Sequence, residues 1–552
     1  MTILIKNTNM DADSFSILKK AAARILNLRG IGISDACADY TITLAVSDTY
    51  EGERFVVDAG NNAASVTASD ALNLHAGVGR FFTESVFDGR GGFEPFEGKI
   101  DFTPAKSLRG MYFATHFYNF YQSAPLEKVY EVIEDLAMRG CNNLFVWFDM
   151  HHFVSMDDPD AVALADRLHA LLKYANRIGI KGSFTMLANE GFASSPEHMR
   201  AEWWIQNGYT SLPDSHYHIE ICPNKDGGLE EILRERRAML ERFADLDIAY
   251  ISYWPYDQGG CTCKKCAPWG ANGFLKILPR FKKLLNEFFP KAELIISTWY
   301  FDKFIPGEWD AFYPHMKDAS LCGSEYIMSF FFNGELPEVL RKNGIPDGLK
   351  FVDFPEISMY TCSPWGGFGA IAYPKFLNTT NQNSGHLYSG GYPYSEGIFE
   401  DVNKYCTQTY YTGLYTDANE AILNYVKFEF CVSGDAAREL ADAIIKSETA
   451  QARDKIHADK TGTSERFPIK DTSDIQYVYD IFTKYDKIIP ESIRKSRAFR
   501  LWYLRAVIDR ELSLCDGYPI RSEICQKCMK ELNEFYYATE KTQRWVKAPV
   551  GV

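Results

Sequence analysis

The sequence predicts an α/β protein whose central part is a (β/α)8 TIM barrel, preceded by a small α/β domain and followed by a helical C-terminal domain. Residues 106–415 alternate short apolar strands with amphipathic helices, and eight strand–helix units can be counted. Residues 1–105 mix strand-like and helix-like patterns, whereas residues 416–552 keep only helical periodicity. A chain of 552 residues is too long for one hydrophobic core, which agrees with three domains.

The N-terminal domain is predicted to begin with a short apolar strand and a helix. Ile3–Ile5 has the pattern of a strand, and Asp13–Leu28 has that of a helix ending at Gly30. Ser69-Asp70 can cap a second helix that continues to about Phe87. Further strands are expected at Tyr40–Val46, Arg54–Ala59, Ser65–Ala68 and Lys99–Phe102.

The barrel strands are short apolar runs, each separated from the next by a helical pattern or a long loop. They are expected at Leu108–Thr115, Asn143–Phe148, Ile180–Leu187, Ile248–Trp254, Leu294–Trp299, Ser320–Glu325, Lys350–Ile357 and His386–Ser389. A doubly wound parallel sheet is the structural alternative. After residue 416 the apolar stripes, such as Ile475–Tyr485, are long enough to require burial against the barrel.

Composition and charge exclude several classes of partner. The formal net charge of −14 argues against a nucleic-acid binder, which needs basic surface to displace counterions, and against an anionic membrane surface. The first residues show no secretory signal, and no apolar window is long enough for a transmembrane helix. Thirteen cysteines, an odd number, fit reduced thiols. We therefore expect a cytoplasmic protein with no nucleic-acid or membrane partner, for which a homo-oligomer remains open.

Acidic and aromatic residues are dense where the predicted strands end, which is where barrel enzymes carry their chemistry. The carboxylates are Asp149, Glu190, Asp257, Glu325, Glu356 and Glu396, and the rings are His116, Trp147, Trp254, Tyr256, Trp299, Tyr326 and Tyr394. Crowded carboxylates raise one another's pKa, so one can stay protonated as a general acid while another is ionised. Glycoside hydrolysis requires such a pair. We predict Asp257 and Glu325 as this pair, and the remaining residues as the sites that bind a carbohydrate substrate.

Four cysteines form a candidate metal site. Cys261, Cys263 and Cys266 form a C-x-C-x-x-C run, and Cys222 could supply a fourth thiolate. Four thiolates suit a closed, structural zinc site. Free thiols in a glycine-rich turn are the alternative. We expect no cofactor for catalysis.

Several segments together resemble a known superfamily. They are Ala76–Phe82, Arg109–Phe120, Arg139–Leu144, Asp257–Cys266 and Tyr394–Asp401. They are similar to segments of β-N-acetylhexosaminidases and bacterial α-glucuronidases, in which an accessory α/β domain precedes a catalytic barrel. The Asp257–Cys266 loop resembles that of α-glucuronidase-like and endo-β-N-acetylglucosaminidase-like bacterial proteins. The resemblance implies a glycoside hydrolase acting on a small or imported oligosaccharide. The hexosaminidases carry two adjacent acids after the fourth strand, whereas this chain has only Asp257 there.

Two other functions remain open. A metal-dependent sugar isomerase or lyase could use His116, His151 and His152 with Asp149 on the same barrel. A non-catalytic carbohydrate-binding protein could use the same aromatic residues. A chelator that abolishes activity would indicate the first, and tight sugar binding without turnover the second.

Overall fold

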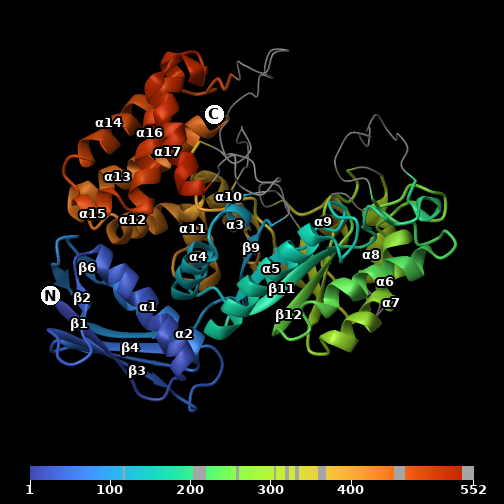
Figure 1. Cartoon of the computed structure of the whole chain (residues 1–552), viewed down its shortest axis with the longest axis horizontal. Helices are drawn as coiled ribbons and strands as arrows, with labels where there is room; N and C mark the ends of the chain where they lie inside the picture. Colours follow the sequence, from blue (N-terminus) through green and yellow to red (C-terminus); the bar gives the residue numbers. More distant parts are fainter. Residues whose placement is uncertain are drawn as a thin grey trace.

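The chain has three parts in the computed structural model, which describes residues 1–115, 119–202, 219–256, 260–303, 306–316, 323–329, 335–358, 368–452 and 466–537. In Figure 1 the N-terminal domain (blue) and the C-terminal helices (orange to red) lie on the left. The barrel extends from the centre to the right. Within the described ranges, no helix combines the length and apolar character needed to cross a bilayer.

The N-terminal domain is a six-stranded sheet with strand order β2-β1-β3-β5-β4-β8. The strands are β1 (Thr2–Asn7), β2 (Gly32–Ile33), β3 (Tyr40–Val46), β4 (Phe55–Gly60), β5 (Ala63–Ala68) and β8 (Gly98–Phe102), with a hairpin of β6 (Val86–Phe87) and β7 (Phe93–Glu94) beside it. Two helices pack on the sheet, α1 (Ala12–Leu28) and α2 (Ala71–Glu84). Asp70 caps α2, as predicted, by accepting a hydrogen bond of 2.7 Å from Asn73 N.

Two contacts join this domain to the barrel. A Cβ atom on Gly79 of α2 would come within 2.1 Å of Met138 O in α4, so glycine allows the two helices to touch. Arg109, on the first barrel strand, is 1% exposed and donates to Glu53 Oε2 at 2.7 Å and to Gly140 O at 2.7 Å. The guanidinium therefore depends on a carboxylate of the other domain for its charge partner.

Eight parallel strands close the barrel. They are β9 (Leu108–Phe113), β10 (Asn143–Trp147), β11 (Lys181–Leu187), β12 (Ile248–Trp254), β13 (Glu293–Ser297), β14 (Tyr326–Ser329), β15 (Lys350–Asp353) and β16 (Tyr388–Gly391), and the short β17 (Tyr394–Ser395) extends the pairing with β9. Because β9 pairs with both β10 and β16, the sheet closes on itself. The predicted barrel is confirmed, and the doubly wound sheet, which has two edges, is wrong.

Helices surround these strands. They are α3 (Phe120–Ser123), α4 (Leu126–Met138), α5 (Pro159–Ile178), α6 (Gly228–Glu241), α7 (Gly273–Phe288), α8 (Glu308–Met316), α9 (Glu338–Asn343), α10 (Pro374–Ser384) and α11 (Asp401–Thr412). Most follow a strand and return the chain to the N-terminal end of the barrel. The loops at the C-terminal end are longer, and they carry the acidic and aromatic residues noted in the sequence.

Glycines make the closure between β9 and β16 possible. A Cβ atom on Gly390, whose φ is +130°, would lie 1.5 Å from Leu108 O. A Cβ atom on Gly110 would lie 2.3 Å from the ring of Tyr392. Contacts this short are forbidden, so any other residue would separate the first and last strands.

The sixth predicted strand is displaced. It was expected at Ser320–Glu325, but β14 spans Tyr326–Ser329. Gly323, with φ of +74°, belongs to a turn, and Glu325 O accepts a hydrogen bond of 2.7 Å from Lys350 N at the start of β15. The inward side chains Tyr326 and Met328 fill the barrel interior, which explains why this later segment is the strand.

The C-terminal region is helical, as predicted. It contains α12 (Ala418–Glu429), α13 (Gly434–Lys446), α14 (Ile475–Tyr485), α15 (Glu491–Arg494), α16 (Arg497–Leu514) and α17 (Glu523–Tyr536). Tyr536, near the end of α17, packs its ring against Phe120 and Phe399, with centroids 5.9 and 5.1 Å away. Its hydroxyl donates to Glu396 O at 2.9 Å. The last helix thus packs on the C-terminal end of the barrel.

Tyr536→Ala should lower the apparent free energy of unfolding by about 3–5 kcal/mol, because a large buried ring is lost. Tyr536→Phe keeps the ring and loses one hydrogen bond, so about 1 kcal/mol is expected. Chemical denaturation followed by circular dichroism measures both. Wild-type stability in Tyr536→Ala would show that α17 does not contribute to the packing of the barrel.

Candidate active site

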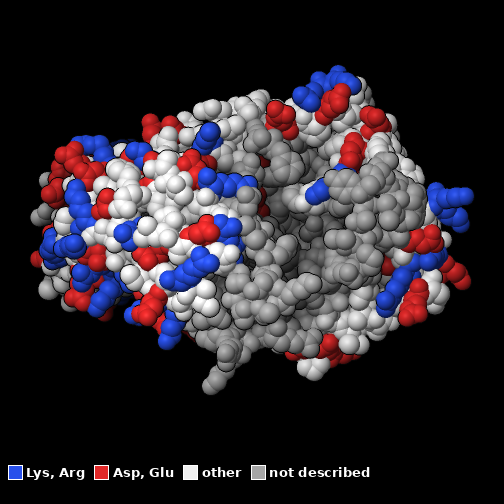
Figure 2. Space-filling model, turned by 90° about the horizontal axis from the view of Figure 1, so that it is seen from above, with Lys and Arg blue, Asp and Glu red and all other residues white. Residues whose placement is uncertain are grey.

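The C-terminal ends of the barrel strands bring together most of the predicted site residues. Those the structure describes there are Trp147, Asp149, Glu190, Trp254, Trp299, Glu356, Tyr394 and Glu396. His116 and Asp257 lie outside the described residues. Figure 2 shows the molecule from above, hollowed between the C-terminal helices on the left and the loops on the right. On the coloured part of this face, basic and acidic side chains are intermixed, with no continuous basic patch.

Aromatic rings pack against one another at this end of the barrel. The Trp254 ring centroid lies 5.7 Å from Trp299 and 5.1 Å from Phe354, and Phe354 lies 6.1 Å from Tyr394. Trp299 is half-buried and stacks on Tyr300 at 4.5 Å, whereas the other rings are largely buried. Such a surface suits the apolar C–H faces of sugars. Phe354 was not among the predicted site residues, although its position one residue beyond β15 follows the inward alternation.

Two neighbouring carboxylates lie at the same end of the barrel. Glu356 follows β15, is half-buried, and accepts a hydrogen bond of 2.8 Å from Ser358 N. Glu396 follows β17, is 3% exposed, and accepts one of 2.9 Å from the Tyr394 hydroxyl. Burial, together with the neighbouring charge of Glu356, raises the pKa of Glu396 well above its ordinary value. Of the two carboxyls, Glu396 is therefore the one whose charged form is disfavoured.

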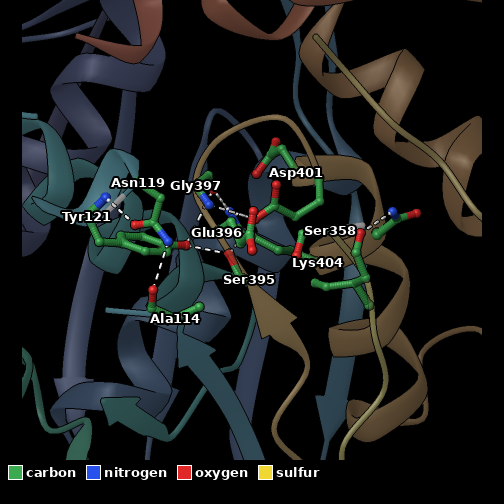
Figure 3. A network of polar contacts seen from close by, with 12 residues as sticks. Ala114, Asn119, Tyr121, Ser358, Ser395, Glu396, Gly397, Asp401 and Lys404 are labelled. Carbon is green, nitrogen blue, oxygen red and sulfur yellow. Dashed lines mark hydrogen bonds and ion pairs between the residues drawn. The ribbon is translucent and has the colours of Figure 1, made fainter. Parts of the chain in front are cut away.

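A buried polar network holds the Glu396 turn (Figure 3). Glu400 accepts hydrogen bonds from the Ser395 hydroxyl at 2.6 Å and from Gly397 N at 2.8 Å. Lys404, one turn along α11, donates to Gly397 O and lies 3.8 Å from Glu400. Tyr121 of α3 shares a short hydrogen bond with Ser395. The backbone on both sides of Glu396 is thereby fixed from two helices.

A second group of polar residues follows β10 and β11. Glu190 Oε1 lies 2.6 Å from His151 Nδ1 and accepts a hydrogen bond from Met150 N at 2.9 Å. Burial raises the pKa of Glu190, but the hydrogen bonds and charge of His151, together with the charge of Arg236, outweigh burial and hold that pKa below its ordinary value. Asp149 Oδ2 lies 3.0 Å from His152 Nε2. The structure therefore uses Glu190 to hold the Asp149–His152 turn.

The mouth of the barrel does not contain all of the predicted residues. Glu325 lies at the N-terminal end of β14, the opposite end of the barrel, and pairs with Lys350 at 2.9 Å on the surface. Tyr326 lies inside the barrel near that same end, 5.4 Å from Tyr250. Their predicted places followed from the misplaced sixth strand. Tyr256 is fully buried, and its hydroxyl donates to Glu308 Oε1 at 2.5 Å. Its side chain is therefore packed inside the protein and does not present a surface to a ligand.

Glu308 is a structural residue that the sequence did not single out. Besides the Tyr256 hydroxyl, it accepts hydrogen bonds from Gly270 N at 2.9 Å and Asp302 N at 3.2 Å. Burial raises its pKa to about 7. It lies at the start of α8, which no catalytic pattern marks. Glu400 and Lys404 were also not predicted as site residues. Their i,i+4 spacing is common on exposed helices and does not point to a buried site.

The four predicted metal ligands do come together. The sulfur atoms of Cys222, Cys261, Cys263 and Cys266 lie within 4.8 Å of one another. Asp149, His151 and His152 form a second group whose ligand atoms lie within the same limit. In that group, however, each imidazole already has a carboxylate neighbour, Glu190 or Asp149.

Several solved structures similar to this chain are glycoside hydrolases. The chain matches a family 138 enzyme targeting pectin rhamnogalacturonan II at a TM-score of 0.58 and 12% identity, over 100% of this chain and 76% of that one. It matches a family 89 glycoside hydrolase from Clostridium perfringens at 0.60 and 14%, over 95% and 65%. A family 115 4-O-methyl-α-glucuronidase with specificity for decorated arabinogalactans matches at 0.58 and 9%, over 99% and 77%.

The chain thus shares its fold with these glycoside hydrolases, as its sequence resemblance implied. It spans slightly less than two thirds of the family 89 enzyme. No protein-family model matches the chain, and no curated protein matches its sequence.

The raised pKa of Glu396 predicts a pH-dependent cost in stability. The folded chain keeps this proton above pH 4.5, the ordinary pKa of the group, whereas the unfolded chain releases it, so stability from this group falls as pH rises toward the folded pKa. Glu396→Gln removes the titration. From about pH 5 to about pH 8, the unfolding free energy of the variant should gain about 1 kcal/mol or more on wild type, since one pKa unit is worth about 1.4 kcal/mol.

Urea denaturation at several pH values measures this difference. Glu94→Gln, at an exposed position of the N-terminal domain, is the matched control and should follow the wild-type curve. A Glu396→Gln curve parallel to wild type would mean that Glu396 is not held protonated in the fold.

Proposed function

We propose that this protein is a glycoside hydrolase that cleaves a glycosidic bond in a small oligosaccharide, using a pair of carboxylates. The observation that carries the proposal is the half-buried Glu356 beside Glu396, whose pKa is raised, next to packed aromatic rings at the C-terminal end of the barrel. Neighbouring carboxyls with separated pKa values are the arrangement that acid–base chemistry on a sugar requires.

Asp257 and Glu356 are the proposed catalytic pair. Asp257 follows β12 and Glu356 follows β15, the fourth and seventh strands, so a sugar ring could lie between them. Tyr256 is held by Glu308, and Gly260 exchanges hydrogen bonds of 2.7 and 2.8 Å with Asn189, so the chain is anchored on both sides of the segment that carries Asp257. Glu356 replaces Glu325, which lies at the other end of the barrel.

Glu396 is proposed as a positioning residue. It is 3% exposed, so substrate cannot reach it easily, but its neutral carboxyl lies close enough to Glu356 for the two to affect each other's charge. A neutral neighbour allows Glu356 to ionise without a second negative charge beside it. Glu356 would then serve as the base or nucleophile, and Asp257 as the general acid.

The substrate class is proposed from the neighbours. One is a 4-O-methyl-α-glucuronidase, and the family 89 enzyme was solved with 2-acetamido-1,2-dideoxynojirmycin. Uronides and N-acetylhexosaminides are therefore the first glycosides to test. Trp254, Trp299 and Tyr394 are the proposed sugar platforms, with Trp147 beneath them and Asp149 and His152 as partners for hydroxyl groups.

A metal-dependent isomerase or lyase is the second candidate, because Asp149, His151 and His152 lie within ligand distance of one another. Both imidazoles contact carboxylates, Glu190 and Asp149, an arrangement that serves hydrogen bonding to sugar hydroxyls and metal binding alike. Two results together would favour this candidate instead. Wild-type isomerisation or elimination would depend on added metal, and the His152→Ala variant, which lacks one ligand, would show neither activity.

Asp257→Asn and Glu356→Gln should each lower turnover by at least about a hundredfold, the usual scale of general acid–base catalysis. Glu396→Gln should lower it far less, because the amide resembles the neutral carboxyl. Glu325→Gln is the matched control and should leave turnover unchanged. Steady-state rates, with folding checked by circular dichroism, measure all four. Near-normal turnover in Glu356→Gln would exclude that residue from the reaction.

A screen of nitrophenyl glycosides tests the activity itself. Release of nitrophenol from a glucuronide or an N-acetylhexosaminide is expected, with a bell-shaped dependence on pH from the coupled carboxyls. Sugar binding by calorimetry without turnover of any glycoside would indicate the non-catalytic alternative.

A further inference from the structure

Two loops of the barrel meet at a cluster of four thiols. Cys222 belongs to the chain between β11 and α6, and Cys261, Cys263 and Cys266 belong to the loop between β12 and α7. Cys222 Sγ lies 3.9 Å from Cys263 Sγ and 3.7 Å from Cys266 Sγ. Zinc–sulfur bonds of about 2.3 Å in a tetrahedron place sulfur atoms about 3.8 Å apart. The spacing is therefore that of a metal tetrathiolate.

The same distances exclude disulfide bonds in this arrangement. A disulfide joins sulfur atoms at about 2.05 Å and uses them in pairs, whereas Cys222 lies nearly equally far from two partners. All cysteines in the described ranges are free thiols. Three of the four are buried, and Cys263 is half-buried, so solvent has little access to the cluster.

The surroundings of the cluster provide donors for negatively charged sulfur. Asn224 Nδ2 donates to Cys266 Sγ at 3.1 Å, and Glu202 N donates to Cys261 Sγ at 3.4 Å. Lys276 donates to Asn224 Oδ1, which turns the amide nitrogen of Asn224 toward the sulfur. Four thiolates around a divalent ion leave a net charge of −2, and outer hydrogen bonds of this kind stabilise it.

We propose that these four cysteines bind one zinc ion, with Asn224 as its outer-shell partner. Four protein ligands leave no open position, so the ion is structural and takes no part in the reaction. It would link the segment following β11 to the segment following β12, where Asn189 already bonds to both Ile221 O and Gly260. The proposal does not depend on the proposed glycosidase activity.

Elemental analysis of the full chain, purified under reducing conditions without chelator, should find about one zinc per chain. Replacement of zinc by Co²⁺ should give the intense visible absorption of tetrahedral cobalt bound to sulfur, a signal independent of catalysis. Cys263→Ser should lose this sulfur-to-metal signature, whereas Cys37→Ser, at an exposed thiol, should keep it. Asn224→Ala retains all four ligands, and its zinc affinity against a competing chelator should fall about 10- to 100-fold.

Three results would overturn the proposal. They are a protein without zinc that does not take up one Co²⁺ per chain, iron as the bound metal, and an intact mass two protons lighter that reports a disulfide among these cysteines under reducing conditions. Wild-type affinity in Asn224→Ala would remove Asn224 from the site while leaving the four ligands in place. Zinc content and cobalt absorption are measured without substrate, so glycosidase results affect neither.

Discussion

The barrel can close because no side chain stands between its first and last strands. Gly390 places its α-carbon directly over the carbonyl of Leu108, and Gly110 leaves room for the Tyr392 ring. Closure brings β17 beside β9, so Tyr394 and Ser395 pair with Tyr112 and Phe113. The position of Glu396 depends on that pairing, since this residue follows β17 immediately. A side chain at position 390 would disturb both strand pairing and the location of the buried carboxyl.

Side chains from three parts of the chain make hydrogen bonds to the turn after β17, which carries Glu396. Tyr121 reaches it from α3, Lys404 and Glu400 from α11, and Tyr536 from the last helix. A buried carboxyl beside a second one is costly to hold, because each disfavours the charge of its neighbour. Hydrogen bonds from several elements hold the Glu396 turn in place despite this unfavourable interaction. The helical C-terminal region is therefore part of the environment of the site and not an appendage.

Strong periodic signals allowed most of the fold to be predicted. The strand at Ile248–Trp254 matches β12, and the cap at Asp70 begins α2, because apolar periodicity and capping are local properties. The prediction for Glu325 was wrong because the sixth strand was expected at Ser320–Glu325, whereas pairing with β13 and β15 places β14 at Tyr326–Ser329. Phe354 and Glu308 act through tertiary contacts, and such contacts leave no pattern in the residues around them.

Arg109 joins the N-terminal domain to the barrel through an ion pair. Its guanidinium belongs to the first barrel strand, is 1% exposed, and relies on Glu53 of the neighbouring domain for its counter-charge. A barrel expressed alone would lose this counter-charge, because Glu53, whose side chain is 36% exposed, belongs to the N-terminal domain. Exchange of this domain between related proteins would therefore succeed only where both residues travel together. The Arg109–Glu53 ion pair thus limits which N-terminal domains could replace this one.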